Sequence, residues 1–201
     1  MEAVDAGKLA TTDVSDGSLR KILLHDDARI RELVKKHWGD VAGANTEEMK
    51  KEVARLLEVV GQGSGNPYQG KRLFRENCGK CHKLFEEGGQ IGPDLTSFKR
   101  DNIERVLTNV VNPSLEIREG FENHVVITTD GRVANGFLAD RDSQVVVLRG
   151  VDGQNLIFRR DEIEDMRAIP KSVMPEGTLK LLNEQQLRDL FAYLRASQPV
   201  N

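Results

Sequence analysis

The sequence predicts an α+β protein that is mainly helical and carries an inserted antiparallel β-sheet. Three observations lead to this prediction. Apolar residues recur at helical spacing near both ends of the chain. Residues 120–170 instead hold short runs of strand-forming residues, joined by Asp130-Gly131 and Asp152-Gly153, which are typical of hairpin turns. A glycine-rich stretch at 61–67 separates a short helical N-terminal region from the rest.

The N-terminal region begins with residues 1–17, which are small and polar, and we expect them to be disordered. Apolar residues at near-helical spacing then predict helix over 18–37. Ser18 and Asp26 are both suitable N-caps, so this range fits either one bent helix or two short ones.

The second predicted helix covers residues 46–60, where apolar side chains line one face. Asn45 with Glu48 resembles a capping box at its start, and Gly61 is placed to end it. The stretch Gly-Gln-Gly-Ser-Gly-Asn-Pro that follows has the composition of a linker. We therefore expect two domains, residues 1–62 and residues 63–201.

The second predicted domain alternates helices with a block of strands. Asp101 with Glu104 is expected to cap its middle helix, which Asn112-Pro113 ends. Residues 82–100 contain Gly88, Gly89, Gly92 and Pro93 and predict mostly loop. The predicted helices are 68–78, 101–111 and 183–196, and the predicted strands are 122–129, 132–139, 144–149, 154–160 and 165–169.

Composition excludes several classes of protein. Hydrophobic residues make up 38% of the 201 residues, which is typical of a soluble globular chain with a real core. The formal net charge is -3, so nothing predicts binding to nucleic acid, which needs clustered Lys and Arg. No apolar run approaches the roughly 20 residues of a membrane-spanning helix. The first residues also lack the basic start and apolar stretch of a secretory signal.

The strongest chemical signal is Cys78-Gly79-Lys80-Cys81-His82. Two thiols at this spacing can each form a thioether to one vinyl group of haem, and the next histidine then lies under the iron. The alternatives are a zinc knuckle and a redox dithiol. Zinc needs four ligands, and there is no second Cys pair. A redox dithiol of the thioredoxin type needs a βαβ context, which is missing here. We therefore predict one covalent haem c.

The sixth iron ligand is predicted to be Met174, which lies in an irregular segment stiffened by Pro175. Met1 is terminal, Met49 lies in the helix before the linker, and Met166 lies at the end of the β block. His124, at the start of a strand, is a rival ligand, although such a histidine is more often an ordinary sheet residue. Gly92-Pro93 is either a simple turn or a loop that presents a carbonyl to the proximal histidine.

These features together resemble class I cytochromes c. Residues 66–198 resemble more closely the haem-binding C-terminal domain of large proteins from planctomycetes and verrucomicrobia. The residues that carry the resemblance are Gly70-Lys71-Arg72-Leu73-Phe74, Cys78-Gly79-Lys80-Cys81-His82, Gly88-Gly89, Gly92-Pro93-Asp94-Leu95-Thr96, Asn112-Pro113-Ser114, Asp130-Gly131-Arg132, Ser172-Val173-Met174-Pro175-Glu176-Gly177 and Asp189-Leu190-Phe191-Ala192-Tyr193-Leu194.

The resemblance implies that Gly70 and Phe74 pack on Leu190 and Tyr193, where the first and last helices of the domain cross. It also implies His82 as proximal ligand, Met174 as distal ligand and the β block as a family insertion. Pro93 would offer its carbonyl to the His82 imidazole, and we expect Pro93 and Leu95 to contact the haem. Residues 18–60 would be the tail of helical repeats.

These expectations predict an electron carrier rather than an enzyme, with a dehydrogenase, either fused in the same polypeptide or separate, as electron donor. The alternative is a haem-based sensor or peroxidase-like domain with an open or displaceable sixth position. The β block is a candidate for homo-oligomer formation. Basic residues near the haem motif either steer an acidic redox partner or form a solvated face: Lys71, Arg72, Arg75, Lys80 and Lys83. Since haem attachment takes place outside the inner membrane, we expect a periplasmic or otherwise extracytoplasmic protein from which this chain is an excised part.

Overall fold

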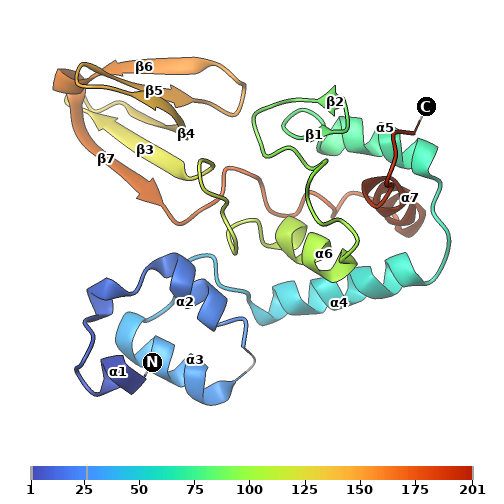
Figure 1. Cartoon of the computed structure of the whole chain (residues 1–201), viewed down its shortest axis with the longest axis horizontal. Coiled ribbons are helices and arrows are strands. Elements are labelled where there is room, and N and C mark those ends of the chain that lie inside the picture. The colour runs from blue at the N-terminus through green and yellow to red at the C-terminus, as the bar shows by residue number, and fades with distance from the viewer. Residues whose placement is uncertain (1, 26, 201) are drawn as a thin grey trace.

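The computed structural model describes residues 2–25 and 27–200, and it confirms the predicted α+β class. Helices occupy both ends of the chain, and an antiparallel sheet lies to one side of them (Figure 1). The helices are α1 (Glu2–Asp5), α2 (Asp16–Ile22), α3 (Ala28–Trp38), α4 (Glu47–Gly61), α5 (Pro67–Asn77), α6 (Ile103–Val111) and α7 (Glu184–Leu194). The strands are β1 (Lys83–Leu84), β2 (Glu87–Gly88), β3 (Asn123–Thr128), β4 (Val133–Arg141), β5 (Val145–Arg149), β6 (Asn155–Arg159) and β7 (Ile163–Ile169).

The range 18–37 forms two short helices, α2 and α3. Their N-caps are Ser15, which accepts from the Ser18 N–H, and Asp27, which accepts from two amides of the first turn of α3. The prediction that Ser18 is the cap was therefore wrong by three residues, and Asp26 lies outside the described residues. A side-chain oxygen caps a helix only when it precedes the first turn, and here that turn begins earlier than the apolar pattern indicated.

The expected disorder of residues 1–17 was also wrong for the described part of that segment. Helix α1 buries Val4, and Asp5 forms an ion pair with Lys36 and a hydrogen bond with His37 of α3. These partners lie more than thirty residues away, so the local composition of the segment gave no sign of them.

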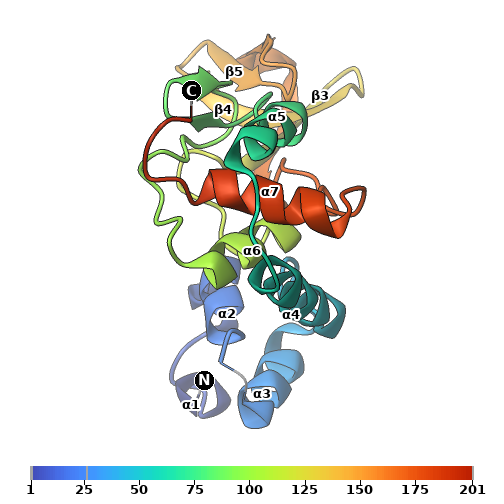
Figure 2. The same cartoon turned by 90° about the vertical axis from the view of Figure 1, so that its right-hand side faces the viewer.

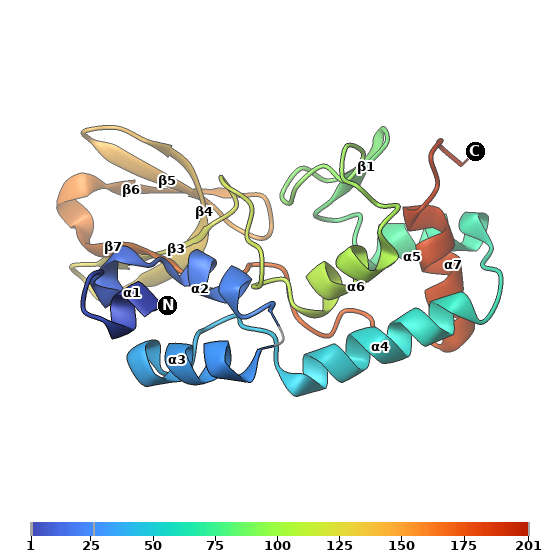
Figure 3. The same cartoon turned by 60° about the horizontal axis from the view of Figure 1, so that its bottom comes forward.

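Helix α4 packs on α6 and α7 and runs beneath them (Figure 3). Thr46, not Asn45, is its N-cap, and the Thr46 side chain accepts from the Met49 N–H at 3.2 Å. Its buried residues Val53, Leu56 and Val59 belong to the same hydrophobic core as the buried residues of α5, α6 and α7. This core includes residues from both sides of the predicted boundary between residues 62 and 63. The division into two domains stays a prediction.

Helices α5 and α7 cross closely, as Figure 2 shows. Gly70 of α5 lies against the backbone of α7: a Cβ there would be 1.9 Å from the carbonyl oxygen of Asp189. The Phe74 and Tyr193 rings pack at 5.5 Å between centroids. Leu190 is fully buried in the same core. The crossing thus has the helices and contacts that the resemblance implies.

The β block forms a five-stranded antiparallel sheet with the order β6-β5-β4-β3-β7. Strands β3 to β6 form a meander that ends at one edge of the sheet. Strand β7 pairs with β3 and forms the opposite edge. The sheet has its own hydrophobic core, separate from the helical core; its buried members are Val126, Val146, Leu148 and Phe158. The inserted sheet therefore packs independently of the helical core.

Helix α6 begins after Asn102, whose side chain accepts from the Arg105 N–H at 3.0 Å. The expected cap at Asp101 was wrong by one residue. Within the described part of the chain, no helix has the length and apolar character needed to cross a bilayer.

Candidate haem site

The two cysteines and His82 lie in one tight turn at the end of α5. Cys78 is the C-cap of that helix, and its amide donates to the carbonyl of Phe74 at 2.8 Å. The amides of Cys81 and His82 then both donate to the Cys78 carbonyl, at 3.1 and 2.9 Å. Because this turn is short and hydrogen-bonded, the helix fixes where both thiols and the imidazole lie.

The His82 imidazole is held by the loop that follows it. Its Nδ1 lies 2.9 Å from the carbonyl oxygen of Pro93. A carbonyl oxygen can only accept, so Nδ1 carries the ring proton and Nε2 keeps a free lone pair. This hydrogen bond is the one that the resemblance implies, and it leaves Nε2 as the ring nitrogen that could bind a metal.

Gly92 brings the loop close enough to make this contact. Its amide donates to the Cys81 carbonyl at 2.8 Å, and a Cβ at this position would lie 2.7 Å from Cε1 of His82. Any larger residue would push against the imidazole. Gly92 and Pro93 thus form a turn that also holds the His82 imidazole in place.

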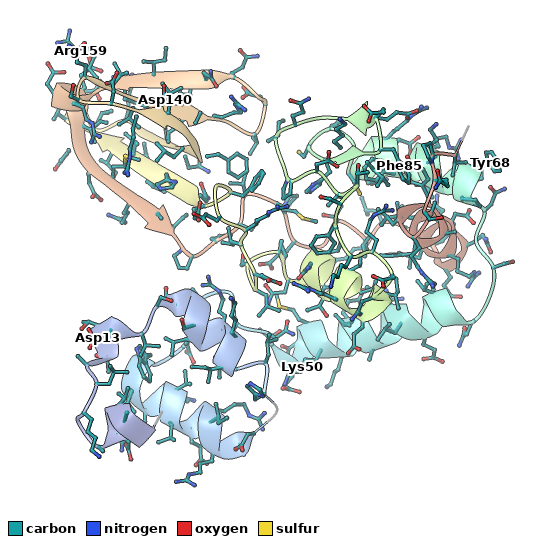
Figure 4. All side chains as sticks on the ribbon, in the orientation of Figure 1. Asp13, Lys50, Tyr68, Phe85, Asp140 and Arg159 are labelled. Atoms are coloured by element: carbon teal, nitrogen blue, oxygen red, sulfur yellow. The ribbon has the colours of Figure 1, made fainter. Side chains whose placement is uncertain are left out.

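A short hairpin of β1 and β2, which the sequence did not predict, shapes the rest of the loop. Gly88 has a φ of +115°, and a Cβ there would lie 2.1 Å from the His82 carbonyl oxygen. The Leu95 amide donates to the Lys83 carbonyl at 2.8 Å, and its side chain packs against the helical core. Phe85, labelled in Figure 4 beside α5, packs on Tyr193. The loop is therefore tied to both crossing helices.

Both thiols are free and half-buried. Burial raises the pKa of Cys78 to about 11, and the neighbouring Cys81 adds to the shift. A redox dithiol needs the opposite, because its nucleophile is a thiolate with a lowered pKa. Among residues 2–25 and 27–200, no three His, Cys, Asp or Glu side chains are placed to share a metal ion. The raised pKa of Cys78 disfavours the redox alternative.

The residues present fit haem c. Two free thiols and an imidazole with an available Nε2 share one turn, and glycines at 88 and 92 leave no side chain between the loop and His82. These are the two thioether anchors and the nitrogen ligand that a c-type haem needs. Cys78 also packs against the hydrophobic core, which provides an apolar wall.

Met174 lies half-buried in the coil between β7 and α7, which passes between the sheet and the helices (Figure 1). Its rivals lie in other settings. Met166 packs against the core of the sheet. Met49 lines a groove of about 140 Å³ beside residues 176–180, and Met1 lies outside the described residues. His124 lies within β3, with Nδ1 3.2 Å from the Glu122 carbonyl oxygen.

The basic residues around the haem motif are partly neutralised. Glu87 forms ion pairs with Lys71 at 2.8 Å and with Arg75 at 2.6 Å, and Lys83 lies 3.5 Å from Glu86. The two ion pairs of Glu87 hold the β1–β2 hairpin to α5. The positive field expected from this cluster is correspondingly weaker than its sequence suggests.

Sequence reasoning missed Arg100, whose signal is only its place in the basic pair Lys99-Arg100 after the loop. Its guanidinium donates to the carbonyls of Leu194 and Ala196, at 2.5 and 2.9 Å, and lies over the Phe85 ring. Arg100 therefore joins the loop of residues 82–100 to the end of α7. No local pattern predicts this contact, because its partners lie more than ninety residues away.

Comparison with known proteins agrees with this geometry. Residues 68–128 match the family model described as Cytochrome c. A search of curated proteins finds no match for the chain. The matched segment begins in α5, contains both thiols, His82 and Pro93, and ends in β3. By this match, residues 68–128 are similar to cytochrome c, and the geometry of the site agrees with that similarity.

Proposed function

We propose that the chain carries one covalent haem c and acts as a one-electron carrier rather than as an enzyme. The observation that carries this proposal is the hydrogen bond from His82 Nδ1 to the Pro93 carbonyl, directly after two free thiols. It fixes the ring and leaves Nε2 as the only ligand atom that His82 can offer. The cytochrome c match supports electron transfer through haem in general.

Each residue has a defined task in this proposal. Cys78 and Cys81 form the two thioethers, and His82 is the proximal ligand. Pro93 orients the imidazole, and Pro93 and Leu95 contact the porphyrin. The haem supplies a one-electron Fe(III)/Fe(II) couple when bound. The surrounding apolar residues exclude water and so disfavour the extra positive charge of the oxidised form.

We propose Met174 as the distal ligand. Its placement supports this choice, since Met174 belongs to neither hydrophobic core, whereas Met166 packs against the sheet core. Pro175 restricts Met174 to extended backbone. A thioether ligand raises the reduction potential relative to a second histidine.

The partner and cellular setting follow from the same proposal. A dehydrogenase, in the same polypeptide or separate, would supply electrons, and the protein would work outside the cytoplasm. The inserted sheet, with a core of its own, supports the planctomycete and verrucomicrobial type of haem domain. That sheet is also the candidate surface for a homo-oligomer. Sedimentation with and without residues 120–168 tests this, and an unchanged number of protomers per particle on deletion contradicts it.

The haem proposal is tested by expression in a host with haem c maturation machinery. We expect a mass increase of one haem, the absorption bands of a c-type haem, and neither in the Cys78→Ala/Cys81→Ala double variant. A colourless wild-type protein of unmodified mass would refute the proposal. Carbon monoxide separates the sensor or peroxidase alternative: fast, complete binding to the reduced protein indicates an open sixth position.

A further inference from the structure

The coil that carries Met174 is fixed to a buried elbow, residues 112–115, that follows α6. All four residues of the elbow are buried. The Asn112 Nδ2 donates to the Gly43 carbonyl at 3.1 Å, and Arg20, itself buried, donates from Nε to the Leu115 carbonyl at 3.3 Å. Helix α2 and the loop between α3 and α4 therefore anchor the elbow from one side.

The packing at the elbow is tight. Gly43 has a φ of +76°, and a Cβ at Gly43 would lie 2.8 Å from the Ser114 carbonyl oxygen. Nothing larger than glycine fits there without moving the elbow. Ser114 is only 4% exposed, so its hydroxyl is held in one place.

On its other side the elbow holds the Met174 coil through two successive hydrogen bonds. The Ser172 amide donates to Ser114 Oγ at 3.1 Å, and the Met174 amide donates to Ser172 Oγ at 3.1 Å. Within residues 2–25 and 27–200, the structure gives residues 171–174 no other hydrogen bond. The backbone at Met174 is thus tied to the rest of the protein through two serine hydroxyls.

We propose that Ser114 and Ser172 are positioning residues that hold Met174 in place as the sixth ligand. This inference rests on the proposed His82 and Met174 ligation. Neither serine touches the iron; each fixes the backbone next to the ligand. A ligand held by a rigid support loses little entropy on binding, so removing either hydroxyl favours the detached form. Half-buried hydrogen bonds of this kind are large enough to shift such an equilibrium about tenfold.

The test uses the holoprotein of residues 1–201 and the variants Ser114→Ala and Ser172→Ala. The first readout is the weak far-red band of the oxidised protein that marks a bond between iron and a thioether, followed as pH rises. The second is the rate and extent of carbon monoxide binding to the reduced protein. We expect the equilibrium constant for detachment of Met174, measured from the loss of the band, to be about tenfold larger in each variant than in the wild type. Each variant should bind carbon monoxide correspondingly more readily.

Two controls separate positioning from simple loss of stability. Ser172→Thr keeps the hydroxyl at this half-buried position and is expected to restore both readouts. Thr178→Val removes a hydroxyl of the same coil that donates to Pro175 at 3.0 Å and does not reach the Met174 amide. We expect Thr178→Val to leave the band and carbon monoxide binding as in the wild type.

The outcomes distinguish this inference from the proposed function. A wild-type protein with the far-red band whose Ala variants behave like Thr178→Val refutes positioning by the serines and leaves the ligation intact. If the wild-type holoprotein lacks the band, Met174 ligation and the inference are both refuted, whatever the variants show. Absence of haem refutes the proposed function itself.

Discussion

Gly70→Ala is the most direct test of the helix crossing on which the candidate haem site depends. Helix propensity alone predicts that this change stabilises the protein by about 1 kcal/mol, because alanine is the better helix former. The structure predicts the opposite sign. A Cβ at Gly70 would lie 1.9 Å from the Asp189 carbonyl oxygen and 2.8 Å from Cβ of Tyr193.

The magnitude follows from these contacts. Ordinary van der Waals contact begins at 3.4 Å, so the backbones of α5 and α7 must separate by about 1.5 Å at the crossing. That movement also loosens the packing of Phe74 on Tyr193. Overpacking of this kind costs about 1–3 kcal/mol. A contact as short as 1.9 Å belongs at the upper end of this range, about 3 kcal/mol. After the gain of about 1 kcal/mol in helix propensity, we expect the free energy of unfolding to fall by about 2 kcal/mol.

Urea unfolding of the holoprotein, followed by circular dichroism, measures this change as a lower midpoint at an unchanged slope. Gly61→Ala is the matched control, because Gly61 ends α4 and a Cβ there would meet open space, with no neighbour from the described residues within 4 Å. We expect the control to be neutral or more stable by up to about 1 kcal/mol. A Gly70→Ala protein as stable as the wild type would show that α5 and α7 do not cross here.

Two further changes test the contacts around this crossing. Asp189→Ala removes the carboxylate that accepts from the Asn66 amide at 2.7 Å, and we expect the same titration to show a loss of about 1–2 kcal/mol; an unchanged midpoint contradicts this. Hydrogen bonds from Lys71 and then Arg75 lower the pKa of Glu87 below its ordinary 4.5. This ion pair therefore stabilises the fold above pH 4.5 and is lost as the pH falls through the lowered pKa. At low salt, the melting temperature should fall more steeply with decreasing pH for the wild type than for Glu87→Gln. An equal dependence on pH in the two proteins would contradict the pairing.

The elements that the sequence predicted well are those with a strong local pattern. Both hairpins around Asp130-Gly131 and Asp152-Gly153 are present, since these dipeptides favour the turn whatever surrounds them. Helix starts were less accurate. Asn45 and Thr46 are both good caps, as are Asp101 and Asn102, and only the folded backbone decides which side chain reaches the first turn.

Elements and contacts that depend on distant partners could not be predicted. The strands β1 and β2 have two residues each, too few for any periodicity, and their turn places Phe85 at a φ of 56°. The cysteines and His82 were predictable because they are contiguous in sequence. The bond between Ser114 and Ser172 joins two motifs that lie far apart in the sequence, and nothing in either motif indicates that they meet.

The glycine-rich stretch at 61–67 shows how the same composition can have two physical causes. Glycines between two helices predict a flexible linker, because they lack side chains that restrict the backbone. In the structure a Cβ at Gly65 would lie 2.0 Å from the Arg188 carbonyl oxygen, so this glycine allows close contact with α7. The next amide, of Asn66, is bound by Asp189 of that helix. A segment held in this way does not let α4 move independently, which agrees with a core that α4 shares with α5, α6 and α7. The apolar face of α4 is therefore part of what supports the turn that carries Cys78, Cys81 and His82, although it precedes the matched segment in the sequence.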